Sequence, residues 1–211
     1  MESWFSVESP FFQWLSKLAD RILINILFVV SALPVITAGA AATALYYTTA
    51  RLERDEGHIW QDYWKAFRTN FKQATILWMI LLVGGLLIGF SVLYYLKVDN
   101  PGGTIGFWLV AVLFFVWAAT CSWVFPLQSR FENPSVNTLK NALIFGLLYF
   151  IKSIVVAAVN FLPVVCFIFF PTAFIYLAFV WLLLWFSTAA SINLYIFKKQ
   201  FAELEKMSLG E

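Results

Sequence analysis

The residues of this sequence that could take part in catalysis are few and widely spaced. The chain has one histidine, His58, and two cysteines, Cys121 and Cys166, which both lie in apolar stretches. No HExxH, CxxC, GxSxG or phosphate-loop motif occurs. Two cysteines without metal-ligand spacing are typical of small core residues. The sequence therefore predicts no catalytic residue, no metal site and no cofactor.

One group of polar residues lies where an apolar stretch ends, and it is the best candidate for chemistry on a membrane lipid or glycan. Arg130 and Glu132, together with His58, are expected near the headgroups. An Arg–Glu pair at the end of a span is more typical of a structural ion pair, so we do not expect an enzyme. Instead, we expect Arg130 and Glu132 to join a cytoplasmic network, in which they either satisfy freed backbone groups or clamp Arg68 and the segment 58–73.

A second group combines aromatic and amide side chains within apolar stretches: Trp123, Asn160, Asn193 and Tyr195. Sugar sites commonly combine such groups, so the chain could itself line a pathway for a neutral solute. No acidic residue occurs between Asp99 and Glu132 or between Glu132 and Glu203. Ion-coupled transporters usually need acidic residues within their spans, so this pattern argues against a pump or a secondary transporter.

The composition shows which kind of fold must position these residues. Of the 211 residues, 62% are hydrophobic, 19% are aromatic and only 12% are charged, and the mean hydropathy is +0.80. A soluble domain is about one quarter charged, whereas aromatic residues are enriched at membrane interfaces. The composition excludes a soluble enzyme, a disordered chain and a disulfide scaffold. The net charge of +2 gives no reason to expect nucleic acid as a partner.

The apolar stretches predict an all-α, polytopic membrane helix bundle that forms one domain over residues 1–211. Spans are expected at 22–47, 74–96 and 105–127, each close to the roughly 20 residues needed to cross hydrocarbon. The stretch 142–197 fits two more, and two registers are open. We favour spans at about 153–173 and about 174–197, because the other register, with a fourth span at about 142–163, would bury Lys152 at the centre of the membrane.

The distribution of Lys and Arg predicts the orientation of these five spans. One side of the membrane holds the segments 48–73 and 128–152 and the C-terminal tail, which together carry ten of these basic residues. Lys152 is not counted, because the two registers place it at different depths. Lys17, Arg21 and Lys97 fall on the other side. Because cytoplasmic loops carry the excess of positive charge, the C-terminus is expected in the cytoplasm and the N-terminus outside.

Two segments have the pattern of amphipathic helices that do not cross the membrane. Residues 10–21 fit a helix lying in the interface, with docking to an external partner as the alternative. In residues 58–73, Trp60, Trp64 and Phe67 recur at helical spacing beside Arg68. These aromatic side chains suit the lipid headgroups, but Trp and Arg are also the residues that dominate protein–protein interfaces.

The first expected span has an unusual sequence. Pro34 should kink it. A stretch of small residues follows over 37–43 and includes Thr37 and Gly39. Small residues four apart let a second helix approach closely. This face could pack within the bundle, contact a partner subunit or line a substrate path.

Three blocks of this chain carry a resemblance to a known family: LPVITAGAAATALY (33–46), YWKAFRTNFKQA (63–74), and FPLQSRFEN (125–133) with LKNA (139–142). Together they resemble the YesL-like family of small membrane proteins, found mainly in Gram-positive bacteria, over residues 11 to about 200. The resemblance implies no catalytic site. It implies gene neighbours that encode carbohydrate ABC importers, extracellular sugar-binding proteins and polysaccharide-degrading enzymes.

The resemblance and the residue patterns together predict an accessory or assembly subunit of an ABC-type importer of oligo- or polysaccharides in the bacterial plasma membrane. The expected partners are its permease subunits, its ATPase and a sugar-binding protein, besides membrane lipid. The residues expected to bind these proteins are Pro34, Thr37, Gly39, Trp60, Trp64, Phe67, Arg68, Arg130, Glu132 and Asn133.

Overall fold

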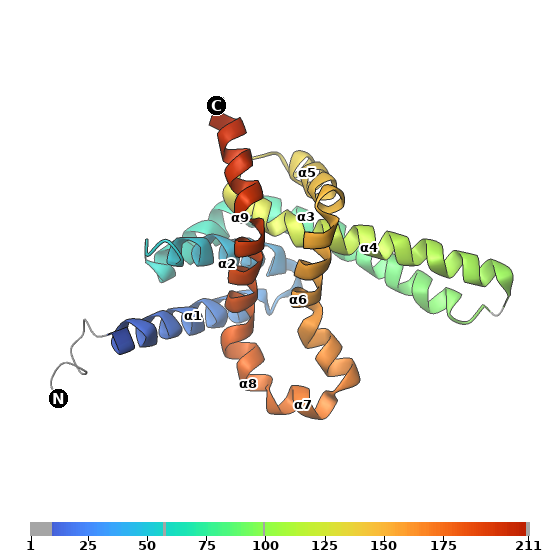
Figure 1. Ribbon diagram of the computed structural model, residues 1–211, viewed down its shortest axis with the longest axis horizontal. Coiled ribbons are helices and arrows are strands. Elements are labelled where there is room, and N and C mark those ends of the chain that lie inside the picture. The colour runs from blue at the N-terminus through green and yellow to red at the C-terminus, as the bar shows by residue number, and fades with distance from the viewer. Residues whose placement is uncertain (1–9, 57, 99, 210–211) are drawn as a thin grey trace.

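The computed structural model describes residues 10–56, 58–98 and 100–209, and every regular element in these ranges is helical. The chain order is α1 (Pro10–Ala32), a 3₁₀ turn η2 (Val35–Thr37), α2 (Ala38–Leu52), α3 (Ile59–Tyr95), α4 (Pro101–Arg130), α5 (Ser135–Leu148), α6 (Phe150–Phe169), α7 (Pro171–Tyr176), α8 (Ala178–Val180), a π-helical segment η3 (Trp181–Trp185) and α9 (Phe186–Leu209). Figure 1 shows two long hairpins, α3–α4 and α6–α9, which project from a common centre.

Four stretches are long and apolar enough to cross a membrane: α3, α4, α6 and residues 178–206, which run from α8 into α9. The protein is therefore a helical membrane bundle, which confirms the predicted fold class. At about 1.5 Å per residue, the 37 residues of α3 extend about 55 Å, well beyond the roughly 30 Å of hydrocarbon.

The predicted first span, 22–47, is wrong as a single helix. Residues 10–21 do not form a separate helix but continue to Ala32 as α1, and the chain then breaks before α2 begins at Ala38. Pro34 is the physical reason: it has no backbone N–H to donate, and it disfavours the helical conformation of Leu33 before it. The sequence predicted a kink, whereas the structure has a complete reversal of direction.

The reversal also corrects the predicted position of the N-terminal segment. The Lys17 Nζ atom lies 2.9 Å from a carboxylate oxygen of Asp55, so the first half of α1 lies beside the loop that follows α2. The prediction that these two segments lie on opposite sides of the membrane is therefore wrong.

The amphipathic segment 58–73 and the predicted second span 74–96 form one continuous helix, α3. No proline occurs between residues 59 and 95, so nothing in the backbone forces a break. The next helix, α4, begins at a capped end: Asn100 accepts a hydrogen bond from the Gly103 N–H at 2.8 Å, and Pro101 occupies the first turn.

The stretch 142–197 divides into two spans close to the favoured prediction, in which Lys152 lies at the end of a span. Lys152 lies in the first turn of α6, where its ammonium donates to the Gln200 side chain at 2.7 Å and to the Ile196 carbonyl at 3.2 Å. The next break falls at Phe170, immediately before Pro171. This position fits the preference of a residue before proline for non-helical backbone.

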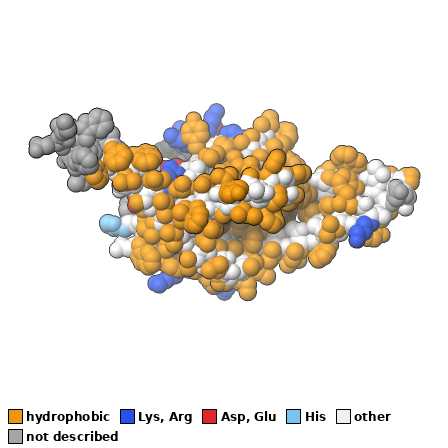
Figure 2. Space-filling view, turned by 90° about the horizontal axis from the view of Figure 1, so that it is seen from below, with side chains coloured by type: hydrophobic (Ala, Val, Ile, Leu, Met, Phe, Trp, Pro, Cys, Tyr) orange, Lys and Arg blue, Asp and Glu red, His pale blue; other side chains and the backbone are white. Residues whose placement is uncertain are grey.

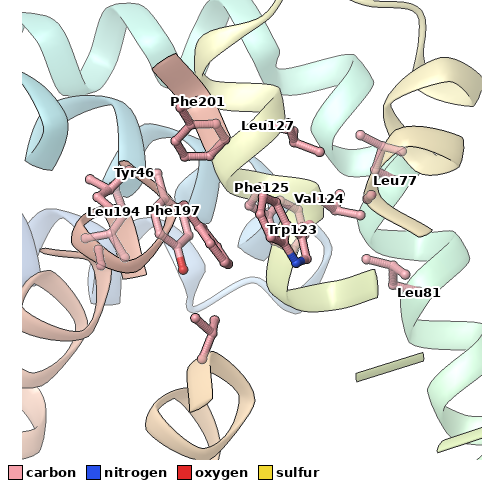
Figure 3. Packing of buried hydrophobic residues seen from close by; sticks show 14 of the residues in the cluster. Tyr46, Leu77, Leu81, Trp123, Val124, Phe125, Leu127, Leu194, Phe197 and Phe201 are labelled. Atoms are coloured by element: carbon pink, nitrogen blue, oxygen red, sulfur yellow. The ribbon is translucent and has the colours of Figure 1, made fainter. Parts of the chain in front are cut away.

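The bundle is held together by an aromatic core around Trp123 of α4 (Figure 3). Its indole is fully buried, stacks on Phe197 of α9 with 3.8 Å between the ring centroids, and donates to Ser153 of α6 at 2.9 Å. Phe201 of α9 and Phe145 of α5 lie 6.1 and 5.6 Å from it between ring centroids. Helices α4, α5, α6 and α9 thus meet at one side chain, while Figure 3 shows Leu77 of α3 farther out in the same core.

The outer surface is that of a protein surrounded by lipid. Hydrophobic side chains cover most of the face in Figure 2, and charged side chains gather near its edges. Large apolar residues such as Phe90, Trp108 and Phe169 are more than half exposed along the two projecting hairpins. In water such a surface would be an aggregation liability, but in a bilayer it contacts acyl chains.

Candidate functional site

The first turns of α3 present an aromatic face, which consists of Trp60, Trp64, Phe67 and Phe71. The ring centroids follow one another at 6.0, 5.5 and 5.5 Å, so the side chains form a continuous row. Trp60 is 58% exposed, whereas Trp64 and Phe67 are half-buried. The row follows from the i, i+4, i+7 and i+11 spacing, which places these side chains on one side of the helix.

A shallow groove of about 750 Å³ runs along this part of α3. Trp60 and Trp64 supply its apolar lining, and Lys65 and Arg68 add two positive charges. Arg68 is exposed and makes no ion pair among the described residues. The groove therefore combines exposed aromatic area with free cationic side chains.

A polar cleft of about 620 Å³ lies next to this groove and shares Lys65 and Thr69 with it. It lies between α2, the first half of α3 and the end of α4, and it brings together Arg130, Glu132 and Asn133. Blocks that are far apart in the sequence, 63–74 and 125–133, thus meet in space.

Amide side chains hold this cleft together. Gln128 of α4 donates to the Asn70 side chain at 3.0 Å, and its oxygen accepts from the Thr138 hydroxyl at 3.2 Å. Gln73 of α3 donates to the Asn133 carbonyl oxygen. Sequence reasoning missed Asn70, Gln73 and Gln128, although their positions beside the end of the apolar stretches were a usable signal.

The predicted network around Arg130 exists, but with a different acidic partner. The Arg130 guanidinium lies 3.2 Å from a carboxylate oxygen of Glu205 in α9 and 4.7 Å from the ring centroid of Phe201. Glu132 is exposed and makes no ion pair within the described part of the chain. The prediction that Glu132 joins this network is wrong, because α9 supplies the carboxylate instead. Of the two roles left open, a clamp on Arg68 is not formed among the described residues.

The three residues of the first predicted span that were expected to bind a partner line neither the groove nor the polar cleft. Pro34 and Thr37 form the turn between α1 and α2, and Gly39 is buried where α2 crosses α3. A Cβ atom on Gly39 would lie 2.5 Å from the Cβ of Trp78 and closer still to the Ala74 carbonyl oxygen. The small face therefore packs against α3 within this chain, so its role as a partner contact stays a prediction that the packing does not favour.

The aromatic and amide residues considered for a solute pathway do not line one cavity. Trp123 is a core residue, and Tyr195 is exposed. The fully buried Asn193 donates to the Tyr46 hydroxyl at 2.8 Å and to the exposed Asn160 at 2.9 Å. These bonds tie α2, α6 and α9 together.

One polar contact that the sequence analysis did not single out joins α1 to the last span. The buried Asn25 side chain donates to the Leu183 carbonyl at 2.9 Å and accepts from the Ser187 N–H at 3.1 Å. In an α-helix these two backbone groups would bond to each other. The π-helical segment separates them, and the Asn25 carboxamide fills the gap.

The described residues contain no group of three His, Cys, Asp or Glu side chains that could hold a metal ion. No curated protein and no solved structure matches this chain. A family model does match it over residues 22–92, which cover the second half of α1, α2 and most of α3. The matching model is that of DUF624, described as a protein of unknown function.

Proposed function

We propose that this protein is an accessory subunit that binds other membrane proteins, with the aromatic face of α3 and its groove as the docking surface. The observation that carries the proposal is the pair of exposed side chains Trp60 and Arg68 beside the half-buried Trp64, at the end of α3 that extends beyond its apolar stretch. Truncating such aromatic and Arg anchors typically costs an interface about 2 kcal/mol or more each.

The resemblance to the YesL-like family supports the class of partner. On that basis, the proposed partners are the permease subunits of an ABC-type importer of oligo- or polysaccharides, and through them its ATPase and sugar-binding protein. The polar cleft beside the groove offers Lys65 and Asn133 as hydrogen-bonding groups at the edge of such an interface. Polar rims of this kind are typical of protein–protein interfaces.

The charge distribution supports a cytoplasmic position for this end of the molecule in the plasma membrane. The ion pairs Lys17–Asp55, Arg51–Asp62 and Arg130–Glu205 gather the start of α1, the end of α2, the start of α3 and the ends of α4 and α9 at one end. Among the described residues, Lys97 is the one basic side chain near the tip of the α3–α4 hairpin. Because positive charge is retained inside, we propose that the first half of α1 and the end of α9 face the cytoplasm.

Co-purification from native membranes tests the proposal. The tagged protein is extracted in mild detergent, and its partners are identified by mass spectrometry. We expect importer permeases to co-purify with the native chain and to be largely lost from the double variant Trp60→Ala and Arg68→Ala. Trp108→Ala is the matched control, because Trp108 is also an exposed tryptophan but lies near the far tip of the hairpin.

The alternative occupant of the aromatic face is lipid headgroups, which tryptophan and basic side chains also suit. In that case the variants would weaken binding to vesicles of anionic lipid, while no protein would be lost in the co-purification. A chain that is purified alone and intact from native membranes would contradict the proposal.

A further inference from the structure

The hairpin formed by α1 and α2 begins and ends at the same end of the molecule. Lys17 on α1 pairs with Asp55, three residues after the end of α2, at 2.9 Å. Ile59, at the start of α3, packs against a small cluster that contains Leu27 of α1 and Ala44 of α2. Figure 1 shows the two helices extending from this end toward the centre of the molecule.

Neither arm of this hairpin has an uncharged helical stretch long enough to cross a bilayer. The 15 residues of α2 extend about 22 Å. In α1, the stretch without charged residues runs from Ile22 to Ala32 and extends about 16 Å. Both lengths are well below the roughly 30 Å of hydrocarbon.

The turn that joins the two arms presents apolar side chains to its surroundings. Leu33 is 73% exposed, and Val35 and Ile36 are each 59% exposed. Within residues 33–37 only Thr37 has a polar side chain, and its hydroxyl is bonded inside the turn. Water is a poor environment for such a surface.

Three carbonyl groups at the turn are bonded by the protein itself. The Thr37 hydroxyl donates to the Ser31 carbonyl at 2.6 Å, and the Thr37 backbone N–H donates to the Pro34 carbonyl at 2.8 Å. The Trp78 indole of α3 donates to the Val35 carbonyl at 2.6 Å. Pro34 has no N–H that would need an acceptor. Non-helical backbone at membrane depth is tolerated only when its polar groups are satisfied in this way.

The neighbours of the turn on α3 indicate its depth. Ala74 is the first residue of the apolar stretch of α3 that is predicted to span the membrane, and Trp78 lies four residues after it. Gly39, two residues after the turn, packs against both Ala74 and Trp78. From Trp78 to the end of α3 at Tyr95 another 25 Å or so of helix remains. The turn therefore lies past the near edge of the apolar stretch and far from its other end.

We infer that α1 and α2 form a re-entrant hairpin whose turn, residues 33–37, is inserted among the acyl chains of one leaflet. The hairpin enters the membrane and returns to the same side without crossing. Its partner is lipid hydrocarbon, because the exposed side chains of the turn are apolar and the carbonyls of Ser31, Pro34 and Val35 are already paired. This inference does not depend on the proposed docking function.

Single-cysteine labelling tests the inference in the full-length chain. In a Cys121→Ala and Cys166→Ala background, single cysteines are introduced at Ser16, Ile36, Glu53 and Lys97, all of which are exposed in the structure. Membrane-impermeant maleimide is applied to intact spheroplasts and to inverted vesicles. We expect Ser16→Cys and Glu53→Cys to react from one side, Lys97→Cys from the other, and Ile36→Cys from neither side until the membrane is dissolved.

Three results would overturn the inference. Reaction of Ile36→Cys from the side of Lys97 would show that the arms cross the membrane. Reaction of Ile36→Cys from the side of Glu53 would place the turn in water. Reaction of Ser16→Cys from the side of Lys97 would show that α1 crosses. Val35→Cys, also exposed, replaces Ile36→Cys if that variant fails to fold.

A second measurement identifies what covers the turn. A fluorophore on Ile36→Cys, with the purified protein in vesicles, is compared in lipids with and without bromine on the acyl chains. Contact with acyl chains predicts a loss of fluorescence in the brominated vesicles, and Lys97→Cys is the control that should lose little. No loss at Ile36→Cys would show that protein covers the turn, which would overturn the inference.

Discussion

At the scale of single residues, polar side chains stabilise this membrane bundle by completing backbone hydrogen bonds at irregular positions. Asn25 occupies the gap between Leu183 and Ser187, and Thr37 and Trp78 satisfy the carbonyls of the turn before α2. In a medium without water each unsatisfied backbone group costs several kcal/mol, so these side-chain bonds stabilise the irregular segments. Sequence alone places Asn25 in an apolar stretch but cannot show which distant carbonyl it faces.

The substitution Asn25→Leu should destabilise the protein through the two backbone groups that it leaves unpaired. We expect a loss of about 1–3 kcal/mol, which corresponds to a melting temperature lower by roughly 2–4 °C per kcal/mol for a chain of this size. Thermal unfolding in detergent measures the shift. Asn137→Leu, at an exposed asparagine of α5, is the control and should change the midpoint little. An unchanged midpoint for Asn25→Leu would show that the Asn25 contacts contribute nothing.

At the scale of elements, close contacts between helix backbones decide which small residues matter. Gly39 allows α2 to lie directly against Ala74 and Trp78 of α3. Gly85 instead faces Trp117 of α4, and Gly89 has nothing within 4 Å of the position that a Cβ would take. The sequence predicted that small residues would mark contacts but did not show which helices would meet, because that depends on the reversal at Pro34.

Leucine at Gly39 should therefore disrupt the packing of α2 on α3, whereas leucine at Gly89 should be tolerated. Overpacking of a tight contact typically costs about 1–3 kcal/mol. The comparison of the two variants by thermal unfolding and by size-exclusion profile separates a packing effect from a general effect of added bulk. Equal stability of Gly39→Leu and Gly89→Leu would contradict the packing described here.

The elements show which parts of the fold follow from the sequence. Hydropathy predicted the membrane class and the apolar cores of α3 and α4, because about 20 consecutive apolar residues have few alternatives to a spanning helix. It failed for 22–47, since a proline turn with paired carbonyls leaves the same hydropathy trace as a kinked span. It also could not assign Glu205 to Arg130, because the two residues lie on helices that meet only after the bundle has formed.

At the scale of the whole molecule, the hairpin tips differ in chemistry from the region in which the hairpins are joined. The tip of α6–α9, with Phe170 and Tyr176, carries no charged residue among those described, and Lys97 marks the tip of α3–α4. The start of α3 and the ends of α2, α4 and α9 carry the aromatic face, the polar cleft and the ion pairs. Polar and charged groups are thus concentrated away from the hairpin tips.

The asymmetry predicts the topology of the chain. A fluorescent protein that folds in the cytoplasm should be bright when fused behind α9, and alkaline phosphatase there should be inactive. Alkaline phosphatase inserted after Lys97 should be active, because that tip is expected outside. The reverse pattern of activities would contradict the proposed orientation, and it would place the aromatic face on the external side.

Site-specific photo-crosslinking at the aromatic face tests the central proposal most directly. The Trp60→p-benzoylphenylalanine variant is irradiated in native cells, and the adducts are identified by mass spectrometry, with Trp108→p-benzoylphenylalanine as the matched control. The account predicts a discrete protein adduct at Trp60 that contains a permease subunit and is absent at Trp108. Lipid adducts alone at both positions, in a folded protein, would contradict a docking role for this face.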